Sequence, residues 1–314
     1  MTKKNNNHVI AIVGPTASGK TSLAVEIAKY FDTEIISADS RQIYKEFNIA
    51  TAKPTIEEMQ GIKHHLTDCV KPTDEFTVAN FADEAKKVIN NLFLQKKIPV
   101  IVGGTGLYFR ILLEAYDLPR VAPNKELRSE LHEIEKQQGA SALHKILQQL
   151  DPQLALTMHP NNTVKIIRAI EVSKTLGIPM SQAQKKKEQQ YDIRWFGLGH
   201  LNGSDRQFLY ERTDNRVDVM IEKGLEKEAW DLYKKYGKIN SLQKTIGYQE
   251  FIDYFEKNIS YSECIEKIKQ NTRRYAKRQL TWFRRNEDIY WLDIKDTTGK
   301  NLIENCLSSL NDLL

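Results

Sequence analysis

The sequence predicts an α/β fold, with a parallel sheet flanked by helices and a mostly helical domain inserted into the chain. Short apolar runs that end in glycine or polar turn residues alternate with stretches of helical apolar spacing, which is typical of a parallel sheet. This alternation stops after residue 118 and resumes near residue 194. We therefore expect a first core part at residues 1–118, a helical insertion at 119–193 and a second core part at 194–314.

The first core part contains three predicted strands and two predicted helices. The strands are short apolar runs at residues 8–13, 34–37 and 98–102. Because these runs are apolar without alternation, each strand is expected to be buried on both faces of its sheet. Residues 22–31 and 76–93 place their apolar side chains three or four positions apart, which indicates helices.

The insertion and the second core part are expected to be rich in helix. Residues 124–149 contain many Glu, Lys and Gln and are predicted as one helix, and a second helix is predicted within 160–176. The second core part returns to strand character twice. Its predicted elements are strands at 194–198 and 289–292 and long helices at 206–236 and 261–285.

Composition favours an intracellular protein of more than one domain. The 314 residues exceed one typical domain, and 40% of them are hydrophobic, which is enough for a sizeable core. No run approaches the roughly 20 apolar residues of a membrane helix, and residues 1–8 lack the apolar core of a signal peptide. Three scattered cysteines (Cys69, Cys264 and Cys306) exclude a disulfide framework or zinc ribbon. We expect a cytoplasmic protein without a membrane partner, and a monomer by default.

The excess positive charge is concentrated in one segment. The chain has 46 Lys and Arg against 41 Asp and Glu, a net charge of +5. Residues 261–285 alone carry +6, and the other residues together carry −1. Tyr275, Trp282 and Phe283 are interleaved with this charge, a pattern that suits contact with RNA phosphates and bases. The alternatives are a solvated helix face and, for Trp282 and Phe283, positions in the core.

Residues 14–21 (GPTASGKT) match the phosphate-binding pattern G-x-x-x-x-G-K-[ST]. They follow a predicted strand and open a predicted helix, so we expect a P-loop NTPase-like core that binds a diphosphate or triphosphate group. Backbone amides and the helix N-terminus supply partial positive charge, Lys20 supplies a full charge, and the Thr21 hydroxyl is a ligand for Mg²⁺. The alternative is that these residues form only a glycine-rich turn before a helix. The predicted phosphate-binding residues are Gly14, Pro15, Thr16, Ala17, Ser18, Gly19, Lys20 and Thr21.

The motif does not identify the compound that carries the bound phosphate group. Kinases, GTPases, ATPases and some group transferases share it. The insertion has only three arginines, unlike the arginine-rich lid of a nucleotide kinase, and no NKxD-like motif for guanine recognition is present. A small-molecule P-loop kinase and an RNA-binding P-loop switch protein remain alternatives at this point.

A second polar loop follows the predicted strand at 34–37. Residues 37–44 (SADSRQIY) lie where α/β sheets place their active sites, at the carboxyl end of a strand. A carboxylate at Asp39 is suited to hold a metal ion or to act as a general base. The alternative is that Asp39 caps the N-terminus of a helix.

Taken together, these stretches resemble the tRNA dimethylallyltransferases (tRNA isopentenyltransferases), in the bacterial form without a zinc finger. The resemblance runs in order over nearly the whole chain. The matching stretches are GPTASGKT (14–21), SADSRQIY (37–44), ATAKP (50–54), HHLTD (64–68), VGGTGLYF (102–109), IIRAIEV (166–172), ERTDNRVDVMIEKGL (211–225), TIGYQE (245–250) and RRYAKRQLTWFRR (273–285).

The resemblance implies transfer of a dimethylallyl group from dimethylallyl diphosphate to the exocyclic amine of an adenosine in tRNA. This adenosine lies directly 3′ of the anticodon in tRNAs that read codons beginning with U. It also implies that the phosphate loop holds the allyl diphosphate with Mg²⁺, and that the partner is the anticodon stem-loop of tRNA.

The resemblance further assigns roles to individual residues. Asp39 corresponds to the general base, Thr105 to a residue that contacts substrate, and Arg212 to a diphosphate-binding arginine. The alternatives are that Thr105 shapes a turn, that Arg212 pairs with a neighbouring acid on its helix, and that 245–249 is simply a helix N-terminus. The expected tRNA-contacting residues are Asp39, Ser40, Arg41, Gln42, Thr105, Val164, Lys165, Ile166, Ile167, Arg168, Lys244, Thr245, Ile246, Gly247, Tyr248, Gln249 and, in the basic segment, Arg273, Arg274, Lys277 and Arg278.

Overall fold

A computed structural model of the chain describes residues 7–114, 116–117, 119–183, 185–186, 188–199, 206–295 and 299–313. The polar residues 1–6 and the expected boundary at residue 118 lie outside these ranges. The chain forms two compact units: a core unit of residues 1–113 and 190–314, and an insertion unit of residues 114–189. The insertion begins and ends a few residues before the expected 119 and 193. Its first and last strands, β5 (Tyr116–Asp117) and β6 (Lys185–Lys186), pair antiparallel, which ties both ends of the insertion to each other.

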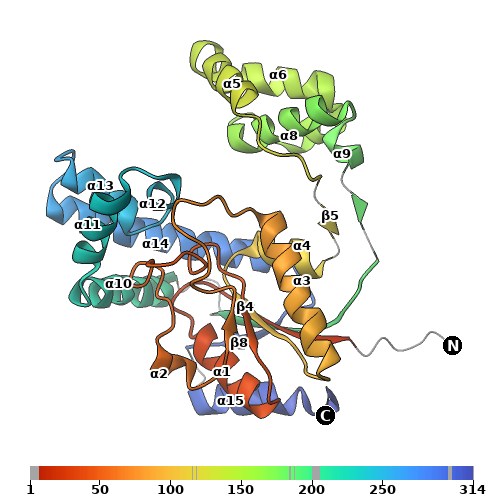
Figure 1. Cartoon of the computed structure of the whole chain (residues 1–314), viewed down its shortest axis with the longest axis vertical. Coiled ribbons are helices and arrows are strands. Elements are labelled where there is room, and N and C mark those ends of the chain that lie inside the picture. The colour runs from red at the N-terminus through yellow and green to blue at the C-terminus, as the bar shows by residue number, and fades with distance from the viewer. Residues whose placement is uncertain are drawn as a thin grey trace. The chain divides into compact units, whose positions relative to one another are not determined.

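The core unit is built on a six-stranded sheet whose strand pairs are all parallel, with the order β3-β2-β4-β1-β7-β8. Helices cover both faces (Figure 1). The predicted fold class is confirmed. The strands are β1 (His8–Val13), β2 (Ile35–Ser37), β3 (His64–His65), β4 (Val100–Gly103), β7 (Asp192–Gly199) and β8 (Tyr290–Asp293).

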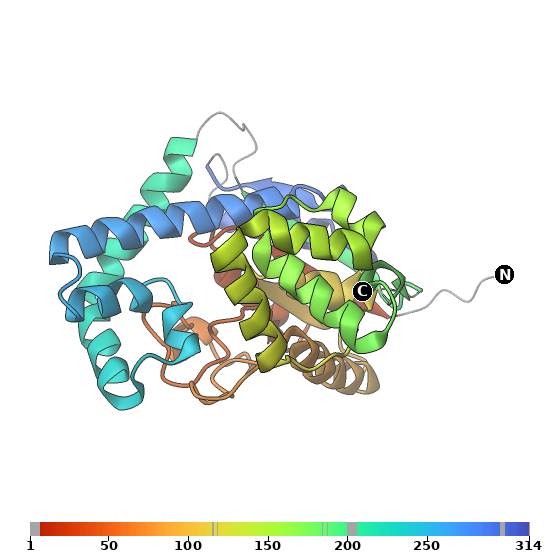
Figure 2. The same cartoon turned by 90° about the horizontal axis from the view of Figure 1, so that it is seen from above.

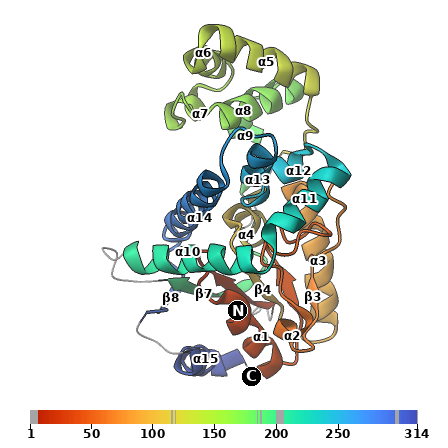
Figure 3. The same ribbon diagram turned by 90° about the vertical axis from the view of Figure 1, so that its left-hand side faces the viewer.

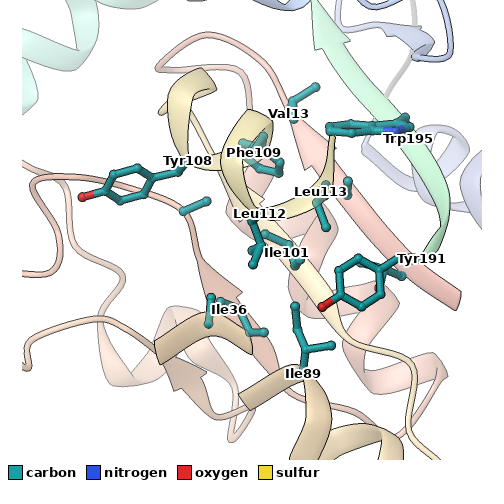
Figure 4. Close-up of a cluster of buried hydrophobic side chains, with 14 of the residues drawn as sticks. Val13, Ile36, Ile89, Ile101, Tyr108, Phe109, Leu112, Leu113, Tyr191 and Trp195 are labelled. Carbon is teal, nitrogen blue, oxygen red and sulfur yellow. The ribbon is translucent and has the colours of Figure 1, made fainter. Parts of the chain in front are cut away.

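The central strand β1 divides the hydrophobic core into two layers. Val9, Ala11 and Val13 pack toward one face, whereas Ile10 and Ile12 pack toward the other, and all five are fully buried. Alternation along a strand sends successive side chains to opposite faces. Both faces are covered, so the strand is apolar throughout. Figure 4 shows the first layer, in which side chains of the sheet meet those of two helices.

Each layer has its own helices. The first layer contains α3 (Val78–Leu94) and α4 (Gly106–Leu113), and the second contains α1 (Lys20–Tyr30) and α15 (Gly299–Ser308). A short 3₁₀ helix, η1 (Asn311–Leu313), follows α15. Within the described residues, no helix is both long enough and apolar enough to cross a membrane.

A third cluster of helices belongs to the same unit. Helix α14, the long blue helix of Figure 2, runs beside α10 (Figure 3). The single helix expected at 206–236 is two helices, because Gly224 adopts a φ of 91° that ends the first one. The helices of this cluster are α10 (Arg206–Glu222), α11 (Leu225–Tyr236), α12 (Asn240–Gln243), α13 (Tyr248–Phe255) and α14 (Tyr261–Phe283). The short helix α2 (Ile56–Met59) has no buried residue and contributes none to this cluster.

The insertion unit is helical, with a core of its own around Leu143, Leu147, Ile166 and Ile170. The helix expected at 124–149 is broken at Gly139, which has a φ of 82°. The helices are α5 (Lys125–Gln138), α6 (Ala140–Leu150), α7 (Pro152–Thr157), α8 (Thr163–Leu176) and α9 (Met180–Ala183).

A buried carboxylate organises one side of the insertion unit. The Glu171 side chain is fully buried and accepts hydrogen bonds from the Asn124 N–H (2.7 Å), from two nitrogens of Arg128 (2.8 Å each) and from Arg168 (2.5 Å). Burial by itself raises the pKa of Glu171, but these hydrogen bonds outweigh it and lower the pKa to about 2. The carboxylate therefore stays charged and links α8 to the start of α5.

Candidate active site

The candidate site lies at the edge of the sheet where β1, β2 and β4 end. Because these strands are parallel, the loops that follow them meet at one edge. These loops contain the phosphate-binding sequence at 14–21, Asp39, and Thr105. The tertiary structure therefore brings together three stretches that are far apart in the sequence.

The phosphate loop is closely packed against its neighbouring strand. A Cβ atom at Gly14 would lie 2.4 Å from the carbonyl oxygen of Leu198 in β7, so only glycine fits here. The Lys20 ammonium donates to the Pro15 carbonyl (2.5 Å) and lies 3.4 Å from the Ser18 hydroxyl. The lysine is thus held inside its own loop.

The pKa of Lys20 is well below that of an ordinary lysine. Burial, followed by the positive charge of Arg216, lowers the pKa of Lys20 to about 7, although the negative charge of Asp39 opposes this shift. A bound diphosphate would reverse the balance by placing negative charge beside the amine. The lowered pKa of Lys20 thus reflects its burial and a neighbouring cation, which outweigh the carboxylate of Asp39.

Asp39 has one oxygen occupied and one available. Its Oδ1 accepts the backbone N–H groups of Arg41 (2.7 Å) and Gln42 (3.2 Å), whereas its Oδ2 has no hydrogen-bond donor among the residues that the structure describes. Asp39 therefore caps a turn at residues 40–43, and the expected alternative of a helix N-terminus is wrong because no helix begins there. The charge of Asp39 also influences Tyr108 and Tyr275, whose pKa values are raised first by burial and then by this carboxylate. Asp39 is the shared negative centre of the site.

Thr105 joins the loop after β4 to the loop after β2. Its hydroxyl oxygen accepts the Ser40 N–H at 3.1 Å, and its backbone N–H donates to the Ala38 carbonyl. It does shape the turn, as the alternative held. Ser40 and Ala38 flank Asp39 in the chain, so these two contacts place Thr105 at the edge of the site.

Two arginines of α10 face the phosphate loop. The Arg212 Nε donates to the Ala17 carbonyl at 2.8 Å, so Arg212 contacts the loop and not Glu211 or Asp214. Arg216 was not expected from the sequence. Its charge acts on Lys20, and burial lowers its pKa while Asp39 opposes the shift. The spacing of four residues from Arg212 was the available signal, because such positions share one helix face.

The predicted tRNA-contacting residues near Asp39 differ in whether their side chains already have hydrogen-bond partners within the protein. The Gln42 side chain is occupied, because its amide nitrogen donates to the carbonyls of Thr51 and Ala52 at 3.1 Å each. The Gln42 side chain thereby holds the loop at residues 51–52 against the loop that follows β2. Ser40 and Arg41 are half-buried, and no side-chain hydrogen bond holds the Arg41 guanidinium among the described residues.

The basic helix α14 has two different sides. Arg273 forms an ion pair with Asp214 of α10 at 2.6 Å, and Lys269 does the same with Asp218 at 2.6 Å. In contrast, Arg274, Lys277 and Arg278 are exposed. Phe283 is buried and Trp282 packs against the same layer of the core, so the core interpretation of these aromatic residues is correct.

The other two predicted tRNA-contacting segments are largely internal. In 164–168, Val164 and Lys165 are exposed, Ile166 and Ile167 lie in the core of the insertion unit, and Arg168 pairs with Glu171. The side chains of Ile166 and Ile167 are therefore packing residues and not surface contacts.

In 244–249, only Lys244 is exposed. Thr245, Gly247 and Tyr248 are buried, and Ile246 and Gln249 are half-buried. The Tyr248 hydroxyl donates to Glu228 at 2.7 Å, and α13 begins at Tyr248, as the helix N-terminus interpretation expects.

The chain is similar to known proteins over nearly its full length. A family model described as IPP transferase matches residues 42–286. A protein of Caldanaerobacter subterraneus named tRNA dimethylallyltransferase is 43% identical over 308 residues, which cover 96% of this chain and 97% of the relative. A protein of Bacillus mycoides with the same name is 41% identical over 290 residues, covering 92% of this chain and 90% of the relative.

Solved structures agree with these sequence comparisons. The tRNA isopentenylpyrophosphate transferase of Bacillus halodurans is 38% identical with a TM-score of 0.73, covering 98% of this chain and 96% of that one. A eukaryotic dimethylallyltransferase acting on tRNA is 29% identical with a TM-score of 0.80, covering 97% and 79%. The family model spans most of the sequence and the relatives exceed 40% identity over nearly all of it, so the chain belongs to the IPP transferase family.

Proposed function

We propose that this protein transfers a dimethylallyl group from dimethylallyl diphosphate to the exocyclic amine of the adenosine directly 3′ of the anticodon, in tRNAs that read codons beginning with U. One observation carries the proposal. The Asp39 carboxylate, with an oxygen that has no donor among the described residues, lies near three cations: Lys20 in the phosphate loop, and Arg212 and Arg216 on α10. This arrangement suits a reaction that removes one proton and releases a diphosphate. The names of the relatives support the same transfer.

The chemistry follows from these positions. The adenine nitrogen forms a bond with the first carbon of the allyl group, and the bond from that carbon to the diphosphate oxygen breaks. The diphosphate leaves with the bonding electrons, and Lys20, Arg212 and Arg216 neutralise its growing charge. The proton of the amine passes to the free Oδ2 of Asp39. Removing this proton matters because the amine's lone pair is delocalised into the ring and makes it a weak nucleophile.

Magnesium fits the residues present. The Thr21 hydroxyl lies in the first turn of α1, is half-buried, and has no protein partner among the described residues. Mg²⁺ prefers oxygen ligands and is commonly held by a hydroxyl or carboxylate together with substrate phosphates. Thr21 would hold the ion against the diphosphate, and the ion would supply further neutralisation of the leaving group.

The RNA side of the proposal rests on α14 and on the position of Asp39, which is half-buried at the edge of the sheet. The exposed cations Arg274, Lys277 and Arg278 suit phosphate contacts. The adenine must leave its stack to reach Asp39, which costs a few kcal/mol and less in a single-stranded loop. An anticodon stem-loop meets both requirements. We further propose that the enzyme works as a monomer in the cytoplasm, where its three free cysteines would stay reduced.

The test is a transfer assay with defined tRNAs. Purified protein, Mg²⁺, radiolabelled dimethylallyl diphosphate and unmodified tRNAs are incubated without ATP. The expected result is label in tRNAs that read codons beginning with U and carry adenosine next to the anticodon, and none when that adenosine is replaced by guanosine. Transfer of the γ-phosphate of ATP to a small molecule in place of prenyl transfer would instead identify a kinase. Salt-sensitive RNA binding with neither activity would indicate a switch protein.

A further inference from the structure

One buried side chain of α14 reaches two loops of the active site at once. Gln279 is 5% exposed. Its Oε1 accepts the backbone N–H of Thr16 in the phosphate loop at 2.8 Å, and its Nε2 donates to the carbonyl of Gly104, after β4, at 3.0 Å. Both ends of the amide are thus used, each by the backbone of a different loop.

The two loops carry different parts of the proposed reaction. Thr16 lies within the phosphate loop that would hold the allyl diphosphate. Gly104 directly precedes Thr105, whose hydroxyl holds Ser40 beside Asp39. Among the residues that the structure describes, no other side chain forms hydrogen bonds with both loops. The amide of Gln279 therefore sets the spacing between the donor-binding loop and the loops around the base.

Gly104 confirms how close this contact is. A Cβ atom on Gly104 would lie 2.0 Å from the Nε2 of Gln279, and its next neighbour outside that side chain is the Gly14 carbonyl oxygen at 3.8 Å. The backbone of Gly104 is not in the left-handed region, since no positive φ is recorded there. Only Gln279 therefore excludes a side chain at this position.

We propose that Gln279 is a positioning residue that holds the phosphate loop at its working distance from the Asp39 and Thr105 loops. The proposal rests on the proposed function. Both hydrogen bonds of its amide go to the backbone of these loops, so its loss should affect donor binding and the chemical step and leave RNA binding unchanged. A buried amide that loses its partner costs on the order of a tenfold change in an equilibrium constant.

The experiment is a double-mutant cycle of Gln279→Ala and Gly104→Ala. Steady-state transfer kinetics are measured for the wild type, both single variants and the double variant. We expect each single variant to lower kcat/KM for dimethylallyl diphosphate about tenfold, with the KM for tRNA within about twofold of the wild type. In the Gln279→Ala background, Gly104→Ala should cause no further loss of kcat/KM, because the glutamine side chain that the new methyl group would displace is absent. Additive losses, or a loss confined to the KM for tRNA, would overturn the proposal.

Two controls separate positioning from damage to the fold. Gln270→Ala removes an exposed glutamine from the same helix and should leave all kinetic constants unchanged. Gln279→Met keeps the volume of the side chain without its hydrogen bonds and should behave like Gln279→Ala in the kinetic assay. A thermal midpoint above the assay temperature shows that each variant is folded when it is measured. If the wild type transfers no prenyl group, the proposed function fails. The role of Gln279 is then decided by titrating the four proteins of the cycle with inorganic diphosphate, where equal affinities would refute it.

Discussion

Asp39 has a structural role in the turn that follows β2 and, in the proposed reaction, a chemical role as the base. Its Oδ1 caps the turn at Arg41 and Gln42, which fixes the carboxyl group in place, and its Oδ2 stays available. Of the two interpretations that the sequence left open, the helix cap is replaced by a turn cap, and the general base stays a prediction that the free Oδ2 allows. A rigidly held base with a free oxygen is what a positioned proton transfer needs.

Replacing Asp39 by asparagine separates these two roles. Asparagine keeps an oxygen for the turn but accepts no proton from the amine, so kcat should fall by about 10²-fold or more. Binding of inorganic diphosphate should not weaken, because a negative charge near Lys20 and Arg216 is removed. Single-turnover transfer and calorimetric titration measure the two effects, with Asp74→Asn in an exposed loop as the control. A normal kcat in the Asp39→Asn variant would exclude Asp39 as the base.

The depressed pKa of Lys20 predicts a pH-dependent affinity for diphosphate. With a pKa of about 7 in the free protein, Lys20 loses its proton above neutrality, and an incoming anion must then be bound together with a proton. Affinity should fall by up to about tenfold per pH unit above pH 7. In the free protein, stability should rise from pH 7 toward the ordinary lysine pKa, because the unfolded chain keeps the proton that the folded chain has lost.

The control for this prediction is Lys20→Arg, since an arginine stays charged throughout the range. Dissociation constants for inorganic diphosphate are compared at pH 6, 7.5 and 9. Ionisation of the ligand affects both proteins equally, so the ratio of their affinities isolates Lys20. Parallel profiles for the two proteins would show that the lysine keeps its proton in the free site.

At the scale of elements, α14 is a helix with two charged sides. Toward α10, Arg273 and Lys269 are neutralised by Asp214 and Asp218. Away from it, Arg274, Lys277 and Arg278 are exposed. The net charge of residues 261–285 therefore overstates the positive charge that is exposed to a binding partner. The same helix also supplies Gln279 to the phosphate loop, so it serves the proposed RNA surface and the donor site together.

The exposed side of α14 predicts a change in salt dependence. Replacing Arg274, Lys277 and Arg278 together by glutamine should weaken tRNA binding and reduce the slope of log K against log salt by about 2–3, as expected for three phosphate contacts. Fluorescence anisotropy across a salt series measures the slope. A matched triple substitution of Lys87 on α3, Lys96 in the turn after α3 and Lys300 on α15, all exposed, should leave the slope unchanged.

The paired side of α14 should behave differently. Arg273→Gln removes the partner of Asp214, whose second oxygen is already buried without a hydrogen bond. We expect a loss of about 1–3 kcal/mol in stability and little change in the salt slope. If the Arg273 variant instead changes the slope as the exposed cations do, this arginine faces the RNA.

At the scale of the whole molecule, the chain has two units with separate hydrophobic cores. The insertion unit depends on Glu171, whose pKa of about 2 makes its contribution to stability sensitive to acid. A lowered carboxyl pKa stabilises the folded state above the ordinary glutamate value, and this stability is lost as the pH falls from there toward 2. The core unit has no such dependence on Glu171.

The two units can be observed separately because all four tryptophans, Trp195, Trp230, Trp282 and Trp291, belong to the core unit. Glu171→Gln should destabilise the insertion unit by about 2–3 kcal/mol, since hydrogen bonds to a charged group contribute roughly 1.5–3 kcal/mol and the two arginines are partly hydrated. Urea denaturation should then show an early loss of circular dichroism without a change in tryptophan fluorescence. Glu130→Gln on the exposed surface of α5 is the control. Coincident transitions by both probes would mean that the units unfold as one.

The sequence by itself determined the parallel sheet, the phosphate loop and the existence of the insertion. These features are local: apolar runs without alternation at β1, β2 and β4, and a glycine-rich loop between a strand and a helix, leave few other structures. Helix breaks at Gly139 and Gly224 were not anticipated, because a glycine inside a helical pattern is tolerated in some helices and ends others.

Only the tertiary structure decided which charged residues are available. Arg273 and Arg274 are neighbours in the sequence, yet one is paired with α10 and the other is exposed. Arg216 and Gln279 reach the phosphate loop from helices about 200 and 260 residues away in the chain. Ion pairing and burial depend on what packs against each side chain. These contacts join segments that are distant in the sequence, so residue type and spacing alone do not predict them.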